Sequence, residues 1–195
     1  MVRRNTRQLI LDVARDLFNE RGIAAISTNH ICEAAGISPG NLYYHFSNKQ
    51  AIILELFHQM IAQWDEEPPP SEISLKSFYS QLEKMFSLIW LYRFLHREFA
   101  VLVREHEAFA SSFQSIQKRR MQEMDKALDV YIAAGVFRPM KREERSSVKR
   151  MLWFFSLHWI PQLELEGHRI TEARLREGIP LLRMVFDPFL IERRK

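Results

Sequence analysis

Cysteine, glycine and long apolar runs are scarce in this sequence, and each scarcity excludes a class of structure. Cys32 is the only cysteine among 195 residues, so no intramolecular disulfide can form. Six glycines are too few to suggest a loop that cradles phosphate. The densest apolar run, residues 151–163, includes His158 and Pro161 and is too short to span a bilayer.

Motifs for catalysis and metal binding are also missing. The seven histidines show no metal-ligand spacing with cysteine or with one another, and no nucleophile motif appears. The sequence therefore predicts no enzyme, no catalytic residue, no metal site and no cofactor. Without a basic neighbour in sequence to activate its thiol, Cys32 is expected to pack between helices and not to sense redox state.

The scarcity of cysteine and of apolar runs also predicts where in the cell the protein is located. A single cysteine is typical of a reducing compartment. Residues 1–7, Met-Val-Arg-Arg-Asn-Thr-Arg, lead into an amphipathic segment without the apolar core of a signal peptide. We therefore expect a cytoplasmic protein that does not use a membrane. The net charge of +4 and the pI near 9.3 agree with a polyanionic partner without requiring one.

Apolar residues recur at helical spacing throughout, and the alternation typical of strands is absent. The sequence therefore predicts an all-α protein. Residues 72–134 contain neither glycine nor proline, but one helix of that length would be unusual, so breaks are predicted near Tyr92 and His106. Further helices are predicted over residues 143–166 and 171–191.

The segment Asp65-Glu66-Glu67-Pro68-Pro69-Pro70-Ser71 is the one clear break in composition. Three consecutive prolines cannot continue a helix and form a stiff connection. We therefore expect two domains, a small one over residues 1–64 and a larger one over residues 72–195.

Residues 27–49 have the pattern of two short helices joined by a tight turn. Ser27 or Thr28 can cap the first helix, and Gly36 can end it in a left-handed conformation. Ser38 can cap the second, with Pro39 at the first helical position, where an N–H is not needed. This arrangement predicts a helix-turn-helix, in which the second helix can enter a DNA groove. A capping box of Ser47 and Gln50 is expected to open the next helix.

These residues, with the helix before them, resemble the tetracycline-repressor (TetR) family of bacterial transcriptional regulators. The resemblance runs from about Thr6 to Leu56 and includes the string Gly-Ile-Ser-Pro-Gly-Asn-Leu-Tyr-Tyr-His-Phe at 36–46, with a lysine three residues later. It implies an N-terminal helix-turn-helix domain and a larger helical C-terminal domain for ligand binding and dimerisation. Positions after about Trp64 carry no motif of the family.

The second helix offers the side chains that we expect to read DNA. Leu42 and Phe46, four residues apart, fill its buried edge, so the aromatic residues between them cannot all turn inward. Asparagine can pair with adenine edges, and tyrosine hydroxyls can reach phosphates. The resemblance assigns DNA contacts to several of the same positions. The predicted DNA-binding residues are Thr28, Asn29, Pro39, Gly40, Asn41, Tyr43, Tyr44, His45 and Lys49.

Lys49 enters this set for a physical reason as well. It is predicted in the first turn of a helix, where the helix dipole disfavours a cation unless an anion such as phosphate is near. The alternative is a solvated surface lysine. Arg3, Arg4 and Arg7 fit either an arm in the minor groove or a solubilising end, and both alternatives stay open.

The C-terminal part suggests a ligand pocket and a dimer interface. Aromatic residues gather around a histidine, which is typical of an apolar pocket with a few polar groups, although a histidine in a core is the alternative. The candidate ligand-binding residues are Trp90, Tyr92, His96, Phe99, Tyr131 and His158. Residues 151–160 are apolar on every side and the last helix has a broad apolar stripe, so a partner chain is expected to complete a four-helix interface. Its predicted residues are Met151, Phe155, Trp159, Ile179, Leu182 and Phe186.

The sequence as a whole predicts a homodimeric, sequence-specific DNA-binding transcriptional repressor. Its partner would be double-stranded DNA with a near-palindromic operator, and a small-molecule effector would release it. The alternative is a ligand-independent DNA-binding adaptor that is controlled by a protein partner.

Overall fold

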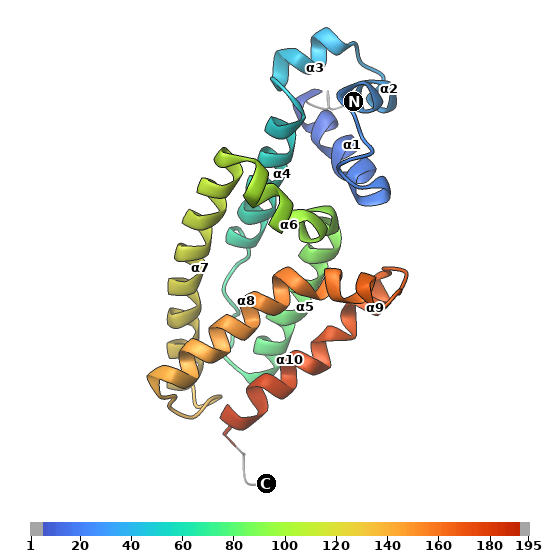
Figure 1. Cartoon of the computed structure of the whole chain (residues 1–195). Coiled ribbons are helices and arrows are strands. Elements are labelled where there is room, and N and C mark those ends of the chain that lie inside the picture. Colours follow the sequence, from blue (N-terminus) through green and yellow to red (C-terminus); the bar gives the residue numbers. More distant parts are fainter. Residues whose placement is uncertain (1–5, 192–195) are drawn as a thin grey trace. The chain divides into compact units, whose positions relative to one another are not determined.

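A computed structural model describes residues 6–191, which form helices joined by short turns (Figure 1). The elements within this range are α1 (Thr6–Arg21), α2 (Thr28–Ala35), α3 (Pro39–His45), α4 (Lys49–Asp65), α5 (Leu75–Leu91), α6 (Arg93–Glu105), α7 (Glu107–Ala133), α8 (Arg142–Leu165), α9 (Glu172–Arg176), α10 (Gly178–Phe186) and the 3₁₀ turn η1 (Asp187–Phe189). The predicted all-α class is confirmed, and pairing of strand type is confined in residues 6–191 to one isolated bridge, Phe137 to Leu190.

The long segment without glycine or proline is broken where the sequence predicts. Tyr92 separates α5 from α6, and His106 separates α6 from α7. At His106 the backbone becomes extended, with φ −130° and ψ 102°. Two single residues with non-helical backbone thus divide a segment that helix propensity alone would predict as one continuous helix.

Two predictions of local structure are wrong. The single last helix over 171–191 is instead α9, α10 and η1, because Pro180 lacks an N–H and is accommodated in the first turn of a new helix. The N-cap of α4 is Asn48, whose side chain accepts a hydrogen bond from the Ala51 N–H at 2.8 Å, and not Ser47. Asparagine is as good a cap as serine, and here it lies one residue closer to the helix.

The chain forms two compact units, and their boundary differs from the break at 65–71 alone. The first unit comprises residues 6–67 with 92–109, and the second comprises 68–91 with 110–191. Within the first, α1 packs against α2, α3, α4 and α6. Helix α6 thus joins the N-terminal helices, although the sequence prediction places it in the C-terminal domain.

The second unit has an aromatic core. The ring of Phe78 meets those of Tyr131, Phe137 and Phe186 edge to face, with centroids 4.6–5.3 Å apart. In this unit α8 and α10 lie side by side, and α5 packs against both α9 and α10 (Figure 1). Within residues 6–191, no helix is both long and apolar enough to cross a membrane.

Candidate nucleic-acid interface

The helix-turn-helix is capped as the sequence predicts. Ser27 caps α2 by accepting from the His30 N–H, and the His30 ring accepts from the Ser27 N–H in return. Gly36 ends α2 with φ +65°, a conformation that glycine adopts without strain. Ser38 caps α3, and Pro39 occupies the first helical position. The turn between the helices is therefore set by local interactions.

Helix α3 buries one narrow edge and exposes the rest. Leu42 and Phe46 are buried in the first unit, as predicted. Tyr44 is 84% exposed and Tyr43 51% exposed, and Asn41 is also exposed. This face of α3 therefore leaves two tyrosines and an asparagine accessible to another molecule.

The remaining predicted DNA-binding residues lie around the same face. Pro39, Gly40 and Asn29 are exposed, while Thr28 and His45 are half-buried. The hydroxyl groups of Thr28 and Tyr43 are 3.1 Å apart, which joins the start of α2 to α3. The rings of Tyr44 and His45 meet edge to face at 5.0 Å. The structure thus brings Thr28 together with Tyr43, and Tyr44 together with His45, and leaves Asn29, Pro39 and Gly40 exposed.

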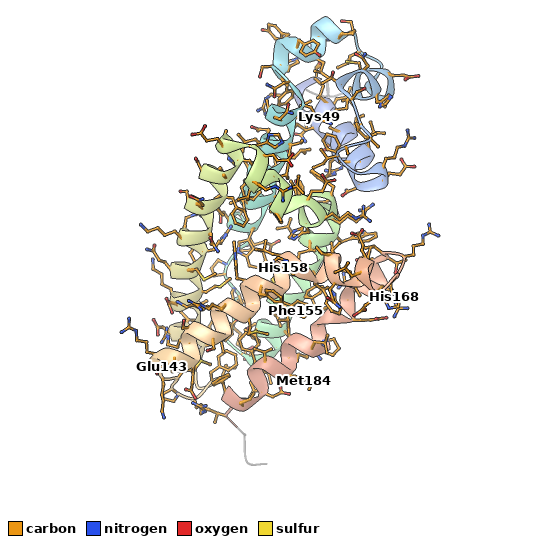
Figure 2. The ribbon with its side chains drawn as sticks, viewed as in Figure 1. Lys49, Glu143, Phe155, His158, His168 and Met184 are labelled. Carbon is orange, nitrogen blue, oxygen red and sulfur yellow. The ribbon has the colours of Figure 1, made fainter. Side chains whose placement is uncertain are left out.

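The physical argument for Lys49 as a phosphate ligand is corrected by the structure. Its ammonium group donates to the carbonyl oxygens of Ile23 and Ile26, both at 2.9 Å (Lys49 is labelled in Figure 2). These two carbonyls compensate the cation at the first turn of α4, so no phosphate is needed to explain it. Two of the three N–H donors of the ammonium group are used within the protein.

The basic N-terminus is described only in part. Arg3 and Arg4 lie outside the described residues. Arg7 pairs with Glu55 on α4 at 2.9 Å and its guanidinium lies 5.1 Å from the centre of the Phe46 ring. Arg7 therefore holds α1 against α4 and the end of α3, which is a packing role.

Cys32 is buried within the helix-turn-helix. Loss of solvent around the thiol raises the pKa of Cys32 above its ordinary value, and a backbone hydrogen bond opposes this shift in part. A raised pKa disfavours the reactive thiolate. The residue packs between helices, as the sequence predicts.

The six candidate ligand-binding residues are divided between the two units. Tyr92, His96 and Phe99 belong to the first unit, and Trp90, Tyr131 and His158 to the second. Tyr92 is fully buried and its hydroxyl accepts a hydrogen bond from Gln63 at 2.8 Å. His96 and Phe99 are also buried, and their rings meet edge to face at 5.0 Å. These three side chains are buried, and a ligand site among them stays a prediction.

In the second unit, the other three candidates have three different surroundings. Tyr131 is part of the aromatic core, Trp90 packs against that core, and His158 is exposed. An exposed histidine and a core tyrosine do not line one apolar pocket.

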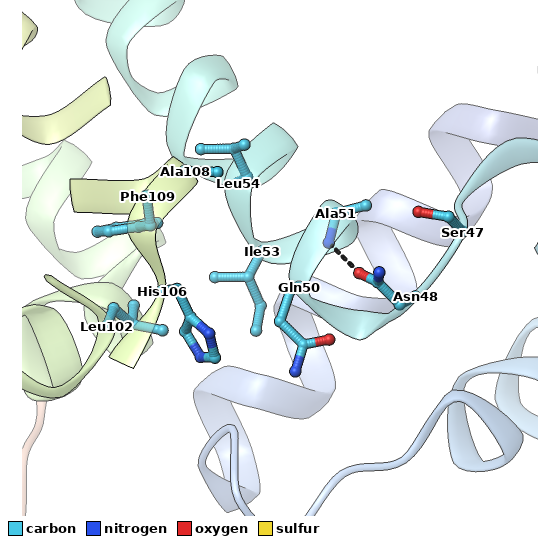
Figure 3. Close-up of a pocket in the computed structure, with 10 residues that line it drawn as sticks. All are labelled: Ser47, Asn48, Gln50, Ala51, Ile53, Leu54, Leu102, His106, Ala108 and Phe109. Atoms are coloured by element: carbon cyan, nitrogen blue, oxygen red, sulfur yellow. Dashed lines mark hydrogen bonds between the residues drawn. The ribbon is translucent and has the colours of Figure 1, made fainter. Parts of the chain in front are cut away.

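A cavity of about 240 Å³ lies elsewhere in the first unit, between the start of α4 and the corner where α6 meets α7 (Figure 3). Its wall is largely apolar, and its polar lining comes from the cap of α4 and from one histidine. The lining residues are Ser47, Asn48, Gln50, Ala51, Ile53, Leu54, Leu102, His106, Ala108 and Phe109. The sequence prediction missed this cavity because its walls are distant in the chain.

Half of the predicted dimer residues lie in the interior of a single chain. Ile179, Leu182 and Phe186 are buried within the second unit of a single chain. Trp159 donates its indole N–H to the Leu175 carbonyl at 2.8 Å, and Phe155 stacks on Trp159. The broad stripe of α10 therefore packs against α8 of the same chain, so a partner is not needed to cover it.

Other residues of α8 and α10 point outward instead. Met151 remains exposed, as does Phe154 at 58%; on α10, Leu181 and Met184 are exposed, the latter at 67%. Figure 2 labels Phe155, His158 and Met184 on these two helices. Of the predicted interface residues, Met151 is exposed and Phe155 and Trp159 are half-buried, and the interface on these two helices stays a prediction.

The capped helix-turn-helix with an exposed second helix defines the class of the protein, a DNA-binding protein of the helix-turn-helix type. Residues 10–56 match the family described as bacterial regulatory proteins, tetR family, and residues 56–195 match the TetR family described as bacterial transcriptional repressor. The second match alone spans more than half of the chain. The chain therefore belongs to the TetR family.

Individual relatives agree with this assignment. The chain is 36% identical over 73 residues to the transcriptional regulator QacR of Staphylococcus aureus, which is 37% of this chain and 39% of that protein. It is 28% identical over 142 residues to the transcriptional repressor KstR2 of Mycolicibacterium smegmatis, 68% of each. A crystal structure of a TetR-family regulator from Marinobacter aquaeolei VT8 matches with a TM-score of 0.84 and 29% identity, over 96% of this chain and 92% of that one.

Proposed function

We propose that this protein is a sequence-specific, DNA-binding transcriptional repressor. The observation that carries the proposal is the exposed face of α3, where Asn41, Tyr43 and Tyr44 point away from a buried edge. Helix α3 is the second helix of the helix-turn-helix, the one that lies in the major groove in proteins of this type. Membership of the TetR family supports the same assignment.

Selection of bound sequences from random DNA tests this function. We expect a near-palindromic sequence, with affinity that falls steeply as salt rises, by about 0.9 in log affinity per log salt for each phosphate neutralised. Asn41→Ala should lose more affinity on the selected sequence than on random DNA, because an asparagine that contacts a base edge contributes to specificity. A flat salt response, or no enriched sequence, would remove the proposal.

We further propose that the protein acts as a homodimer through the outward faces of α8 and α10. Met151, Phe154 and His158 follow one another at helical spacing on α8, and Leu181 and Met184 do so on α10. Since the two helices pack side by side, a two-fold partner with the same helices would cover both sets at once. Such a dimer suits an operator whose half-sites are about 34–36 Å apart.

We propose that a small, largely apolar molecule releases the DNA by favouring a dimer geometry that fits the operator poorly. The cavity beside α4 supports an effector, because about 150 Å³ of apolar space is enough for a benzene ring. Compounds of one or two rings should therefore raise the unfolding temperature and release bound DNA. Ala108→Trp, an exposed position on the cavity wall, should abolish both effects and keep DNA binding.

Those results would separate the effector from the alternative, an adaptor controlled by a protein partner. If no small molecule releases the selected DNA, while a protein bound at α8 and α10 does, the adaptor function replaces the effector.

A further inference from the structure

The α1–α2 loop, residues 22–26, places buried peptide groups between two helices of the first unit. Gly22 ends α1 with φ +81°, and the side chains of Ile23 and Ile26 are buried. Peptide N–H and C=O groups removed from water need partners, or they cost free energy comparable to a lost hydrogen bond. Side chains from other helices must therefore provide some of the hydrogen-bond partners of the loop's peptide groups.

Lys49 supplies the partners on one side. As described above, its ammonium group donates to the Ile23 and Ile26 carbonyls. A charged donor makes a hydrogen bond that is stronger than one between neutral groups. The first residue of α4 thus holds both ends of a short stretch of backbone.

Glu98 of α6 supplies a partner on the other side. One of its carboxylate oxygens accepts the Ile23 N–H at 3.0 Å, so the N–H of Ile23 is held by α6 and its C=O by α4. Helix α6 also holds the end of α1, because the Asn19 side chain accepts the Phe94 N–H at 3.1 Å. Arg97 donates to the Asn19 carbonyl at 3.2 Å.

The loop held in this way leads directly to the DNA-binding face. Ile26 is two residues before Thr28, whose hydroxyl pairs with that of Tyr43 on α3. On the other side, the backbone of Lys49 follows the end of α3 after a short connection. Lys49 therefore joins the segment that enters the helix-turn-helix to the segment that leaves it.

We propose that Glu98 and Lys49 are positioning residues for DNA recognition. Together they hold the α1–α2 loop by its backbone and thereby fix the start of α2 against α3. The proposal rests on the proposed function and adds to it two residues that act through the backbone of the loop and not through contact with DNA.

The test of Glu98 uses the full-length protein and the DNA sequence selected by the unaltered chain. Glu98→Ala removes the acceptor, and we expect about a tenfold loss of affinity for the selected sequence with less than a twofold loss on random DNA. Glu98→Gln keeps an oxygen acceptor and should restore most of that affinity. Glu105→Ala is the matched control, because Glu105 is an exposed residue of the same helix that pairs with its neighbour Arg104 at 3.2 Å, and its replacement changes the net charge equally.

Lys49→Met tests the second residue and separates positioning from phosphate binding. If Lys49 positions the loop, affinity for the selected sequence should fall about tenfold and the slope of log affinity against log salt should not change. If Lys49 binds phosphate, selected and random DNA should weaken alike and the slope should become shallower by about 0.9 per lost contact. The second pattern would overturn the role proposed for Lys49.

The outcomes also separate this proposal from the function on which it rests. If the unaltered chain selects no sequence, both the proposed function and the positioning role are overturned. If it selects one and Glu98→Ala keeps the same ratio of selected to random affinity as Glu105→Ala, only the positioning role is overturned. Should Glu98→Ala not fold, Glu98→Asp decides, because its carboxylate is one methylene further from the Ile23 N–H: the Ile23 amide should lose hydrogen-exchange protection and affinity for the selected sequence should fall, and lost protection with unchanged affinity would overturn the positioning role.

Discussion

Gly178, the first residue of α10, lies close to two aromatic side chains of α8. A Cβ atom at this position would lie 2.7 Å from Cε1 of Phe155 and 2.7 Å from Nε1 of Trp159. Real Cβ atoms do not come so near to other atoms, and both rings are fixed, since they stack on each other and Trp159 is hydrogen-bonded to Leu175. Glycine is required at this position because the side chains of Phe155 and Trp159 leave no room for a Cβ atom, and not because of the backbone conformation.

Gly178→Ala should therefore destabilise the protein by about 1–3 kcal/mol, the usual cost of overpacking. Urea unfolding should show a lower midpoint with an unchanged slope. Gly40→Ala is the control, because a Cβ at Gly40 would meet nothing closer than the Ser38 hydroxyl at 4.0 Å. Equal midpoints for Gly178→Ala and the unaltered chain would contradict the packing of α8 on α10.

The position of Lys49 in the sequence is compatible with two roles, binding a phosphate or donating to backbone carbonyls. A lysine in the first turn of a helix predicts a nearby anion, since the dipole disfavours a cation there. The structure provides two carbonyl oxygens, whose partial negative charges serve the same purpose. The sequence predicts a phosphate near Lys49, whereas the fold supplies two backbone carbonyls as acceptors, and a contact of Lys49 with DNA stays a prediction.

At the scale of elements, the start of α8 has a carboxylate that is held from two directions. Glu144 accepts two hydrogen bonds from Arg138, at 2.9 and 3.1 Å, and one from the Lys141 N–H at 2.8 Å. The hydrogen bonds from Arg138 and then the one from Lys141 lower the pKa of Glu144 from 4.5 to about 2. The charged form thus stabilises the turn that leads into α8.

The pH dependence of stability should show this contribution. Because the pKa is lowered in the folded state, the stabilisation is present above about pH 4.5 and is lost as the pH falls towards about 2. Glu144→Gln should be less stable than the unaltered chain at pH 7, and the difference should shrink steadily below pH 4.5. Urea midpoints measured between pH 7 and pH 3 check this.

Glu143→Gln is the matched control, since Glu143 is the preceding residue of α8 and is exposed (labelled in Figure 2). It should remain close to the unaltered chain over the same range. A gap between Glu144→Gln and the unaltered chain that does not depend on pH would show that the carboxylate charge does not contribute.

At the scale of the whole molecule, the outward face of α8 and α10 leads to a prediction on assembly. Phe154→Asp or Met184→Asp places a charge on this face, and burying an unpaired charge in an interface is strongly unfavourable. Both variants should therefore sediment as monomers at concentrations where the unaltered chain is dimeric, and should bind the selected DNA more weakly. Val130→Asp, at an exposed apolar position on α7, should remain dimeric.

Leu182→Asp would not test the same point. This residue is fully buried in the core of the second unit, so a charge there should unfold the chain and not merely separate a dimer. If the Phe154→Asp variant stays dimeric, the dimer interface does not lie on the outward faces of α8 and α10.

Local signals are enough to predict the helix-turn-helix and several helix ends from the sequence. Ser27, Gly36, Ser38 and Pro39 act on backbone groups within four residues, so their effect can be read without the rest of the chain. The breaks at Tyr92 and His106 were also predictable, because a helix of that length is unusual in a globular protein. Ser47 and Asn48 are adjacent and both are good caps, so the sequence prediction places the cap of α4 one residue too early.

Partners that are distant in the chain follow from the packing of the folded protein. Glu98 meets Ile23 from 75 positions away in the chain, and no local pattern marks that pairing. The stripe of α10 is equally apolar whether α8 of the same chain or a partner chain covers it, so the sequence could not separate Leu182 from Met184. Periodicity shows that a face is apolar, whereas packing of distant segments decides which neighbour buries it.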